Sequence, residues 1–149
     1  MSKSWGTPTW YFLHSLAEHI SETLYKNQNT EVCNMIKLIC SNLPCPDCRA
    51  HAIQYTKSLT PKNVHTKQQL KEYLFNFHNS VNMRTNKGQF NEYNKYKTSR
   101  LEQIFKLFKE KMIHNTYGNR KFNETLSRKN MIKSITNFLN NNKHEITWL

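Results

Sequence analysis

Glycine and proline are scarce in this sequence. Its 149 residues include 3 Gly and 4 Pro, whereas a β-sandwich or barrel needs turn residues between many short strands. Hydrophobic residues are also few, at 37%, although 8 Phe, 7 Tyr and 3 Trp can bury large side chains. These shortages exclude a turn-dense all-β fold and favour one compact helical domain, with at most a tail or an extension.

Long apolar runs and a secretory signal are missing as well. No apolar run approaches the roughly 20 residues of a membrane-spanning helix. The first ten residues, MSKSWGTPTW, lack the charged-then-apolar order of a signal peptide. We therefore expect a soluble, intracellular protein with no membrane partner. In such a compartment the 4 Cys favour redox or metal chemistry over a disulfide scaffold.

Acidic residues are few, with 10 Asp and Glu against 22 Lys and Arg, which gives a formal charge of +12. A basic excess attracts phosphate, so a nucleic-acid-binding domain is an alternative hypothesis. However, the lysines are spread along the chain, and no five consecutive residues are all Lys or Arg. Asparagine is abundant too, and joint enrichment of Lys and Asn is typical of an A+T-rich genome. We favour a solvated basic surface and do not expect a nucleic-acid partner.

Apolar residues recur at spacings of three and four along most of the chain, which predicts amphipathic helices. Thr7 suits a helix cap, and Pro8 suits the first helical position. Polar segments 27–30 and 60–67 and a turn at 86–88 separate the helices, and the aromatic segment 90–96 is not assigned. The predicted helices cover about residues 8–25, 31–43, 45–59, 70–81, 101–112 and 123–139. No segment predicts a strand, so the expected fold class is all-α, with four or five helices around one core.

A turn at residues 117–119, with the sequence Tyr-Gly-Asn, separates the last predicted helix from the others. Asn123 then suits the cap of this last helix. We expect a main domain over residues 1–113 and a helical C-terminal extension over residues 114–149, whose role the sequence does not indicate.

The residues that best suit redox chemistry are Cys45 and Cys48, in the motif Cys-Pro-Asp-Cys. The motif follows one predicted helix and opens the next. A helix N-terminus stabilises a thiolate, and the two-residue spacing lets the sulfurs close into a reducible disulfide. We therefore predict a pair that exchanges disulfides readily. A thioredoxin fold does not fit, because no strand precedes Cys45.

Cys33 and Cys40 are the other two cysteines. Seven residues of helix rise about 10.5 Å, whereas disulfide-bonded Cα atoms lie within roughly 7 Å of each other. We therefore do not expect these two to pair, and we interpret them as small buried hydrophobes. A zinc-stabilised helical module that uses all four cysteines stays an alternative, because a structural zinc site needs four ligands.

Three segments carry a resemblance that is more specific than the cysteine motif alone. They are WGTPTWYFLH at residues 5–14, LPCPDC at 43–48 and FHNSVNMRTNK at 77–87. In order and spacing they resemble the Erv/ALR family of sulfhydryl oxidases. The third segment is most similar to members encoded by large cytoplasmic DNA viruses. The resemblance covers about residues 5–97.

The resemblance implies a four-helix bundle that binds FAD, with one short additional helix, and that forms a homodimer. Trp10 and His14 match positions beside the adenine of FAD, and their four-residue spacing places them on one helix face. Lys87 matches a lysine near the phosphate or ribose, where a cation suits the charge. Tyr96 stands where the family often has a tryptophan. The residues matched to FAD contacts are Gly6, Thr7, Trp10, His14, Cys48, His78, Asn79, Val81, Asn82, Lys87 and Tyr96.

The resemblance also implies that Cys45 and Cys48 are the catalytic residues. By position, substrate thiols attack Cys45, and Cys48 is the sulfur next to the flavin. Two thiols and O2 then give a disulfide and H2O2. The separate shuttle cysteines of many members are missing, because no cysteine precedes Cys33 or follows Cys48. The expected partner is therefore a thiol-containing protein substrate or a thioredoxin-like redox carrier, in the cytoplasm of an infected cell or in the virion.

Overall fold

The computed structural model describes residues 4–91, 93–114 and 122–148 of the chain. Within these ranges the regular elements are helices, so the expected all-α fold is confirmed. None of the described helices has the length and apolar character needed to cross a bilayer. The elements are α1 (Gly6–His19), α2 (Glu22–Cys40), α3 (Pro46–Tyr55), η1 (Thr56–Ser58), α4 (Lys67–Arg84), α5 (Asn94–Lys97), α6 (Leu101–His114), α7 (Phe122–Asn141) and η3 (Lys143–Glu145).

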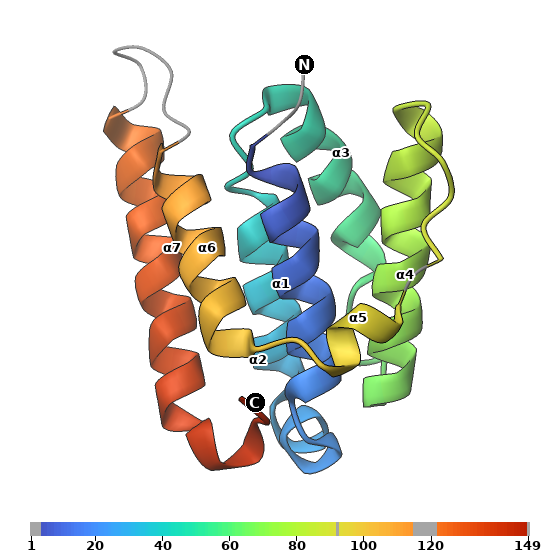
Figure 1. Ribbon diagram of the computed structural model, residues 1–149, viewed down its shortest axis with the longest axis vertical. Coiled ribbons are helices and arrows are strands. Elements are labelled where there is room, and N and C mark those ends of the chain that lie inside the picture. The colour runs from blue at the N-terminus through green and yellow to red at the C-terminus, as the bar shows by residue number, and fades with distance from the viewer. Residues whose placement is uncertain (1–3, 92, 115–121, 149) are drawn as a thin grey trace.

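Helix α1 lies in the middle of the molecule, with α4 on one side and α6 and α7 on the other (Figure 1). Its apolar face is buried, since Phe12, Leu16 and Ala17 are 0% exposed. Phe12 stacks on Phe105 and Phe108 of α6, with ring centroids 5.1 and 4.8 Å apart. Burying a side chain of this kind contributes roughly 1.5–3 kcal/mol, so these rings fix α6 on α1.

The first predicted helix is wrong at its end. It was expected to continue to about Tyr25, but α1 stops at His19 and Ser21 caps a new helix, α2, with its Oγ accepting a hydrogen bond from the Leu24 N–H at 2.9 Å. Ile20 instead forms an antiparallel bridge with Ile146, from the far end of the chain. Apolar spacing continues smoothly through this point, so periodicity alone could not reveal the break.

The predicted loop at residues 27–30 is also wrong, because these residues lie within α2. Their polar, turn-like composition produces a kink instead, with Gln28 at φ −131° and ψ 37°. The side chain of Gln28 donates a hydrogen bond to Asn142 Oδ1 at 2.8 Å. A tertiary partner therefore holds the kink, and the helix resumes on its far side.

Helix α4 begins three residues earlier than its apolar stripe, because Thr66 and Gln69 form a capping box. The third predicted helix is divided into α3 and the short η1, and the unassigned segment 90–96 includes the start of α5. The fifth predicted helix corresponds to α6. The start of α4 lies at an element end, where sequence signals are weakest.

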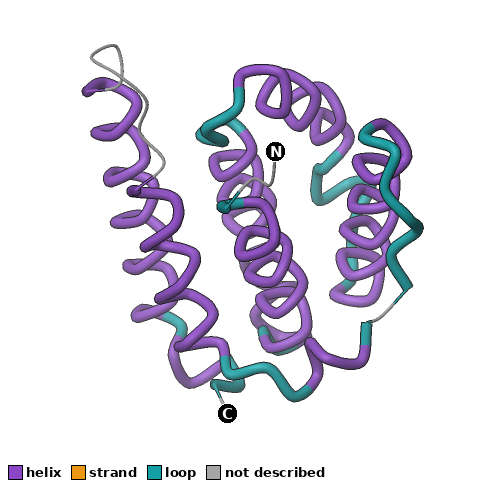
Figure 2. Tube along the Cα trace, turned by 45° about the horizontal axis from the view of Figure 1, so that its top comes forward, coloured by secondary structure: helices purple, strands orange, loops and turns teal. Residues whose placement is uncertain are grey.

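Helix α7 runs alongside α6, and the chain after it turns back toward the junction of α1 and α2 (Figures 1 and 2). Met131, Ile135 and Leu139 of α7 are buried in the same core as α1 and α2. After η3, the Thr147 N–H donates to the His19 carbonyl at 2.8 Å. The helix begins one residue before the predicted cap at Asn123, and the predicted turn at 117–119 lies outside the described residues. The division into residues 1–113 and 114–149 stays a prediction.

Candidate functional site

The two predicted redox cysteines lie at the start of α3, as their motif indicates. Cys45 has extended backbone (φ −87°, ψ 120°) and is the N-cap, and Pro46 takes the first helical turn. In this reduced state Cys45 Sγ accepts a hydrogen bond from the Cys48 backbone N–H at 3.3 Å. The helix N-terminus and this N–H both favour negative charge on the Cys45 sulfur, which suits it to leave or to attack as a thiolate.

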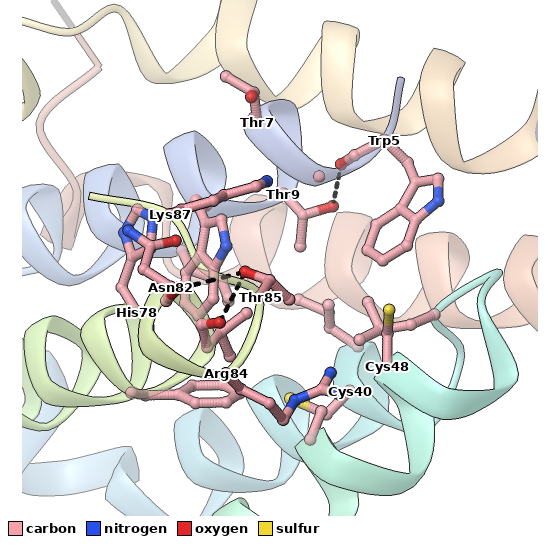
Figure 3. Close-up of a pocket in the computed structure, with 18 of the residues that line it drawn as sticks. Trp5, Thr7, Thr9, Cys40, Cys48, His78, Asn82, Arg84, Thr85 and Lys87 are labelled. Atoms are coloured by element: carbon pink, nitrogen blue, oxygen red, sulfur yellow. Dashed lines mark hydrogen bonds between the residues drawn. The ribbon is translucent and has the colours of Figure 1, made fainter. Parts of the chain in front are cut away.

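A cavity of about 430 Å³ lies between α1, the end of α2, α3 and α4 (Figure 3). This is within the usual range for a small-molecule or cofactor site. Cys48 lines the cavity, and Cys45 is not among its lining residues. Figure 3 shows Cys48 approaching from one side and His78 and Asn82 from the opposite side. The two cysteines of one motif therefore have different surroundings.

The wall of the cavity combines apolar side chains with two cations. Leu13, Ile39 and Val81 are among the apolar residues, and Arg84 and Lys87 are the cations. Both cations are exposed to solvent. This mixture suits a ligand that has a flat apolar ring and a separate anionic group.

Eight of the eleven residues matched to FAD contacts line this one cavity, although they come from three separate segments of the sequence. The other three, His14, Asn79 and Tyr96, do not line it. The eight that line it are Gly6, Thr7, Trp10, Cys48, His78, Val81, Asn82 and Lys87.

His14 lies buried behind the cavity wall and pairs with His78, which is half-buried and lines the cavity. His14 Nε2 and His78 Nδ1 are 2.9 Å apart, and the His78 ring stacks on Trp10 with centroids 4.2 Å apart. Burial lowers the pKa of His14, the neighbouring His78 and Lys95 add to this effect, and the resulting value is about 3. The pKa of His78 is lowered to about 4, mainly by burial and then by the charges of Lys95 and Lys87. Both rings are therefore neutral at pH 7.

One polar atom of this pair has no partner among the described residues. His14 is 0% exposed, and its Nδ1 makes no hydrogen bond there. Buried polar atoms in folded proteins are nearly always hydrogen-bonded. Because His14 does not line the cavity, this unpaired atom does not by itself indicate a ligand.

Asn79 and Tyr96 support the histidine pair. The Asn79 side chain accepts from the Phe90 N–H at 2.6 Å and donates to the Phe90 carbonyl at 3.1 Å. The Phe90 ring then stacks on His78 at 4.3 Å, and Tyr96 stacks on His14 at 4.7 Å. Contact of His14, Asn79 and Tyr96 with a cofactor stays a prediction.

The turn after α4 brings Lys87 to the cavity. The helix ends at Arg84, and Asn86 takes the left-handed conformation (φ 58°) that asparagine tolerates at a helix end. The Lys87 N–H donates to the Asn82 carbonyl at 2.7 Å, and Asn82 Nδ2 donates to the Gly88 carbonyl at 3.1 Å. Asn82 thus lines the cavity and fixes the turn that carries Lys87.

Sequence reasoning missed several residues of the cavity wall, among them Trp5, Cys40 and Arg84. Cys40 was interpreted as a core residue, and it is 2% exposed, yet it also lines the cavity. Burial raises the pKa of its thiol to about 12, which a hydrogen bond with Thr56 partly opposes. Trp5 and Arg84 belong to the first and third motifs, so their place in these motifs was the available signal for them.

The four cysteines do not gather into a metal site. Cys33 is buried beside the Tyr25 hydroxyl, with its Sγ 3.6 Å from the hydroxyl oxygen, and Cys33 and Cys40 are both thiols. In the parts of the chain that the structure describes, no three His, Cys, Asp or Glu side chains are grouped so that they could hold a metal ion. The zinc alternative therefore lacks a ligand cluster there.

Comparison with known proteins gives one family. The chain matches the Erv1 / Alr family over residues 7–102. It is 36% identical over 104 residues to the FAD-linked sulfhydryl oxidase of African swine fever virus (a Tick/Malawi isolate), covering 67% of this chain and 86% of that protein. It is 29% identical over 77 residues to the FAD-linked sulfhydryl oxidase ERV1 of Arabidopsis thaliana, covering 52% of this chain and 40% of that protein.

A further relative is a protein of Invertebrate iridescent virus 3, 35% identical over 88 residues. That alignment covers 58% of this chain and 60% of the viral protein, so the chain spans less than two thirds of this relative. No solved structure matches the chain significantly. Because the family match covers more than half of the sequence and includes most of the first motif and all of the other two, this chain belongs to the Erv1 / Alr family.

Proposed function

We propose that this chain is an FAD-linked sulfhydryl oxidase whose working disulfide is Cys45–Cys48. The observation that carries the proposal is the position of Cys48, which lines a cavity together with seven other residues matched to FAD contacts. The African swine fever virus and Arabidopsis relatives are named for this activity. The reaction joins two thiols into a disulfide and reduces O2 to H2O2.

The residues of the cavity suit FAD. The apolar wall, with Leu13 and Val81, can hold the isoalloxazine ring, and Arg84 and Lys87 can bind the diphosphate. When bound, FAD takes up two electrons from a thiolate and passes them to O2.

The protein's own residues perform the thiol–disulfide exchange. A substrate thiolate attacks Cys45 Sγ, the Cys45–Cys48 bond breaks, and Cys48 leaves as a thiolate on the cavity side. The second substrate thiolate attacks the substrate sulfur of the mixed disulfide, which completes the substrate disulfide and releases Cys45 as a thiolate. The Cys48 N–H, 3.3 Å from Cys45 Sγ, stabilises that leaving thiolate. Two electrons have then moved from the substrate to the cysteine pair, and the two substrate protons have passed to solvent.

We further propose that the electron donor is a thiol-containing protein or a thioredoxin-like carrier, and that the active form is a homodimer in the cytoplasm of an infected cell or in the virion. The viral origin of two relatives supports the proposed location. Light scattering of the purified chain tests the dimer, because a monomeric mass would contradict it.

Oxygen uptake with dithiothreitol tests the activity. FAD-loaded wild-type protein should consume O2 and release an equal amount of H2O2. Cys45→Ser and Cys48→Ser should each lose about a hundredfold or more, because neither can form the disulfide. Cys33→Ala, a change outside the cavity, should keep most of the rate. A wild-type protein that binds no FAD and consumes no O2, or a Cys48→Ser variant with the wild-type rate, would overturn the proposal.

A further inference from the structure

The first two turns of α7 contact both ends of the turn that carries the redox cysteines. This turn, residues 42–49, begins with Asn42 after α2 and ends with Arg49 in α3. Ser127 and Arg128 of α7 contact its first residue, and Glu124 of α7 contacts its last. Cys45 and Cys48 lie between the two contacts.

The contact at Asn42 is made of hydrogen bonds. Ser127 Oγ donates to Asn42 Oδ1 at 2.6 Å, and Arg128 Nη1 donates to the Asn42 carbonyl at 3.4 Å. Arg128 is 1% exposed, which is rare for a charged side chain. Asn42 Nδ2 also donates to the Leu38 carbonyl of α2 at 2.9 Å. The start of the redox turn is therefore held between α2 and α7.

The contact at Arg49 is a charge pair. Arg49 Nη1 donates to the Leu43 carbonyl at 3.1 Å and lies 3.6 Å from Glu124 Oε1. Burial lowers the pKa of Arg128, the charge of Glu124 opposes that shift, and the charge of Arg49 adds to it. One carboxylate of α7 is thus placed where it offsets the charge of the two guanidinium groups that bind the ends of the redox turn.

We infer that α7 is a positioning element for the redox site and that Glu124 sets the reduction potential of the Cys45–Cys48 pair. This inference rests on the proposed function, and it concerns residues outside the 7–102 match to the Erv1 / Alr family. Positive charge near a cysteine stabilises its thiolate and therefore the reduced pair. Glu124 offsets that charge, so it keeps the pair less oxidising than Arg49 and Arg128 alone would make it.

The test is the thiol–disulfide equilibrium of the full-length chain in anaerobic glutathione buffers, with acid quenching and maleimide labelling. The reduced protein takes up four labels and the oxidised protein takes up two, because Cys33 and Cys40 lie about 10.5 Å apart along α2 and do not pair with each other. Glu124→Gln, which removes only the charge, should raise the equilibrium constant for reduction about threefold. The reduction potential then rises by about 14 mV, because a tenfold change in a two-electron equilibrium constant corresponds to 29.6 mV. Glu124→Asp should stay near the wild-type value.

Arg49→Ala gives a second measurement of opposite sign. Removing the cation should destabilise the thiolates, so the pair becomes more reducing. Glu110→Gln on the exposed side of α6 is the matched control and should leave the potential unchanged. The role of α7 is overturned if Glu124→Gln and Arg49→Ala both keep the wild-type reduction potential. It is also overturned if Glu110→Gln shifts the potential by as much as Glu124→Gln does. A wild-type chain that never exchanges two of its four thiols overturns the proposed function as well.

Discussion

Cys45 and Cys48 are separated by two residues but differ in what surrounds them. Cys45 caps α3 and accepts the Cys48 N–H, whereas Cys48 lines the cavity. This difference assigns one sulfur to the substrate and the other to the cofactor in the proposed reaction. The motif spacing predicted the pair, but it could not predict that Cys40 lines the same cavity, because α2 and α3 meet only in the folded chain.

Lys87 is the residue whose contribution to FAD binding is simplest to isolate, since it is exposed and reaches the cavity from a turn. We expect Lys87→Ala to weaken FAD binding about fivefold, or about 1 kcal/mol, and to reduce the dependence of affinity on salt. Fluorescence titration with FAD at two ionic strengths measures both quantities. Lys57→Ala, on η1, is the control, and an equal loss in that variant would contradict a specific role for Lys87.

The buried His14 makes stability depend on pH. Its pKa is lowered from the ordinary value of 6.5 to about 3, so the unfolded chain takes up a proton that the folded chain excludes. The contribution of His14 to stability is therefore present above about pH 6.5 and is lost as the pH falls from there toward 3. Between these pH values the free energy of unfolding falls by up to about 1.4 kcal/mol per pH unit.

Urea unfolding of the wild type and of His14→Phe, at pH 7 and pH 5, tests this dependence. The wild type should lose more free energy of unfolding between the two pH values than His14→Phe loses. His144→Gln, at an exposed position, should follow the wild type. Parallel losses in the wild type and His14→Phe would show that His14 is not the titrating group.

The helices show where sequence patterns succeed and where they fail. The interiors of α2, α4 and α6 follow the apolar spacing, because that spacing decides which face is buried. The break at Ile20 and Ser21 was missed, because its partners, Glu145 and Ile146, are at the other end of the chain. The kink at Gln28 was misread as a loop for a similar reason. Long-range partners override local propensity, and a single sequence does not contain them.

Ser21 is the residue at which local and long-range contacts meet. Its Oγ accepts from the Leu24 N–H and donates to the Glu145 side chain, and its N–H donates to the Glu145 carbonyl at 2.8 Å. We expect Ser21→Ala to lower the free energy of unfolding by about 1–2 kcal/mol. Thr23→Ala, exposed two residues later, should cost less than about 0.5 kcal/mol. Equal melting temperatures for the wild type and Ser21→Ala would contradict this assignment.

At the scale of the whole molecule, α7 completes the core that the family region begins. Ile135 is 0% exposed and belongs to the same buried cluster as α1 and α2. We expect Ile135→Ala to lower the free energy of unfolding by about 2–4 kcal/mol in one cooperative transition, because a cavity forms in that core. Lys133→Ala, on the exposed side of α7, is the control in thermal unfolding. A main transition unchanged by Ile135→Ala would show that α7 folds as a separate unit.

The residue types of the candidate site could be predicted from the sequence where they belong to contiguous motifs. Three such motifs converge on one cavity, which their spacing alone could not show. The contacts of Glu124, Ser127 and Arg128 with the redox turn had no sequence signal, because they join segments about eighty residues apart through side chains with no motif of their own. The excess of basic residues indicated only that an anionic partner is favoured, and it did not identify one.

Anaerobic reduction of the bound flavin by dithiothreitol, followed by visible absorbance, tests most directly whether electrons pass from the Cys45–Cys48 pair into the cavity. We predict that the wild-type chain is yellow with bound FAD and loses that absorbance within seconds to minutes, while Cys48→Ser stays yellow under the same conditions. A Cys48→Ser variant that bleaches at the wild-type rate would contradict the path through Cys48. A wild-type chain that never binds FAD would contradict the whole assignment.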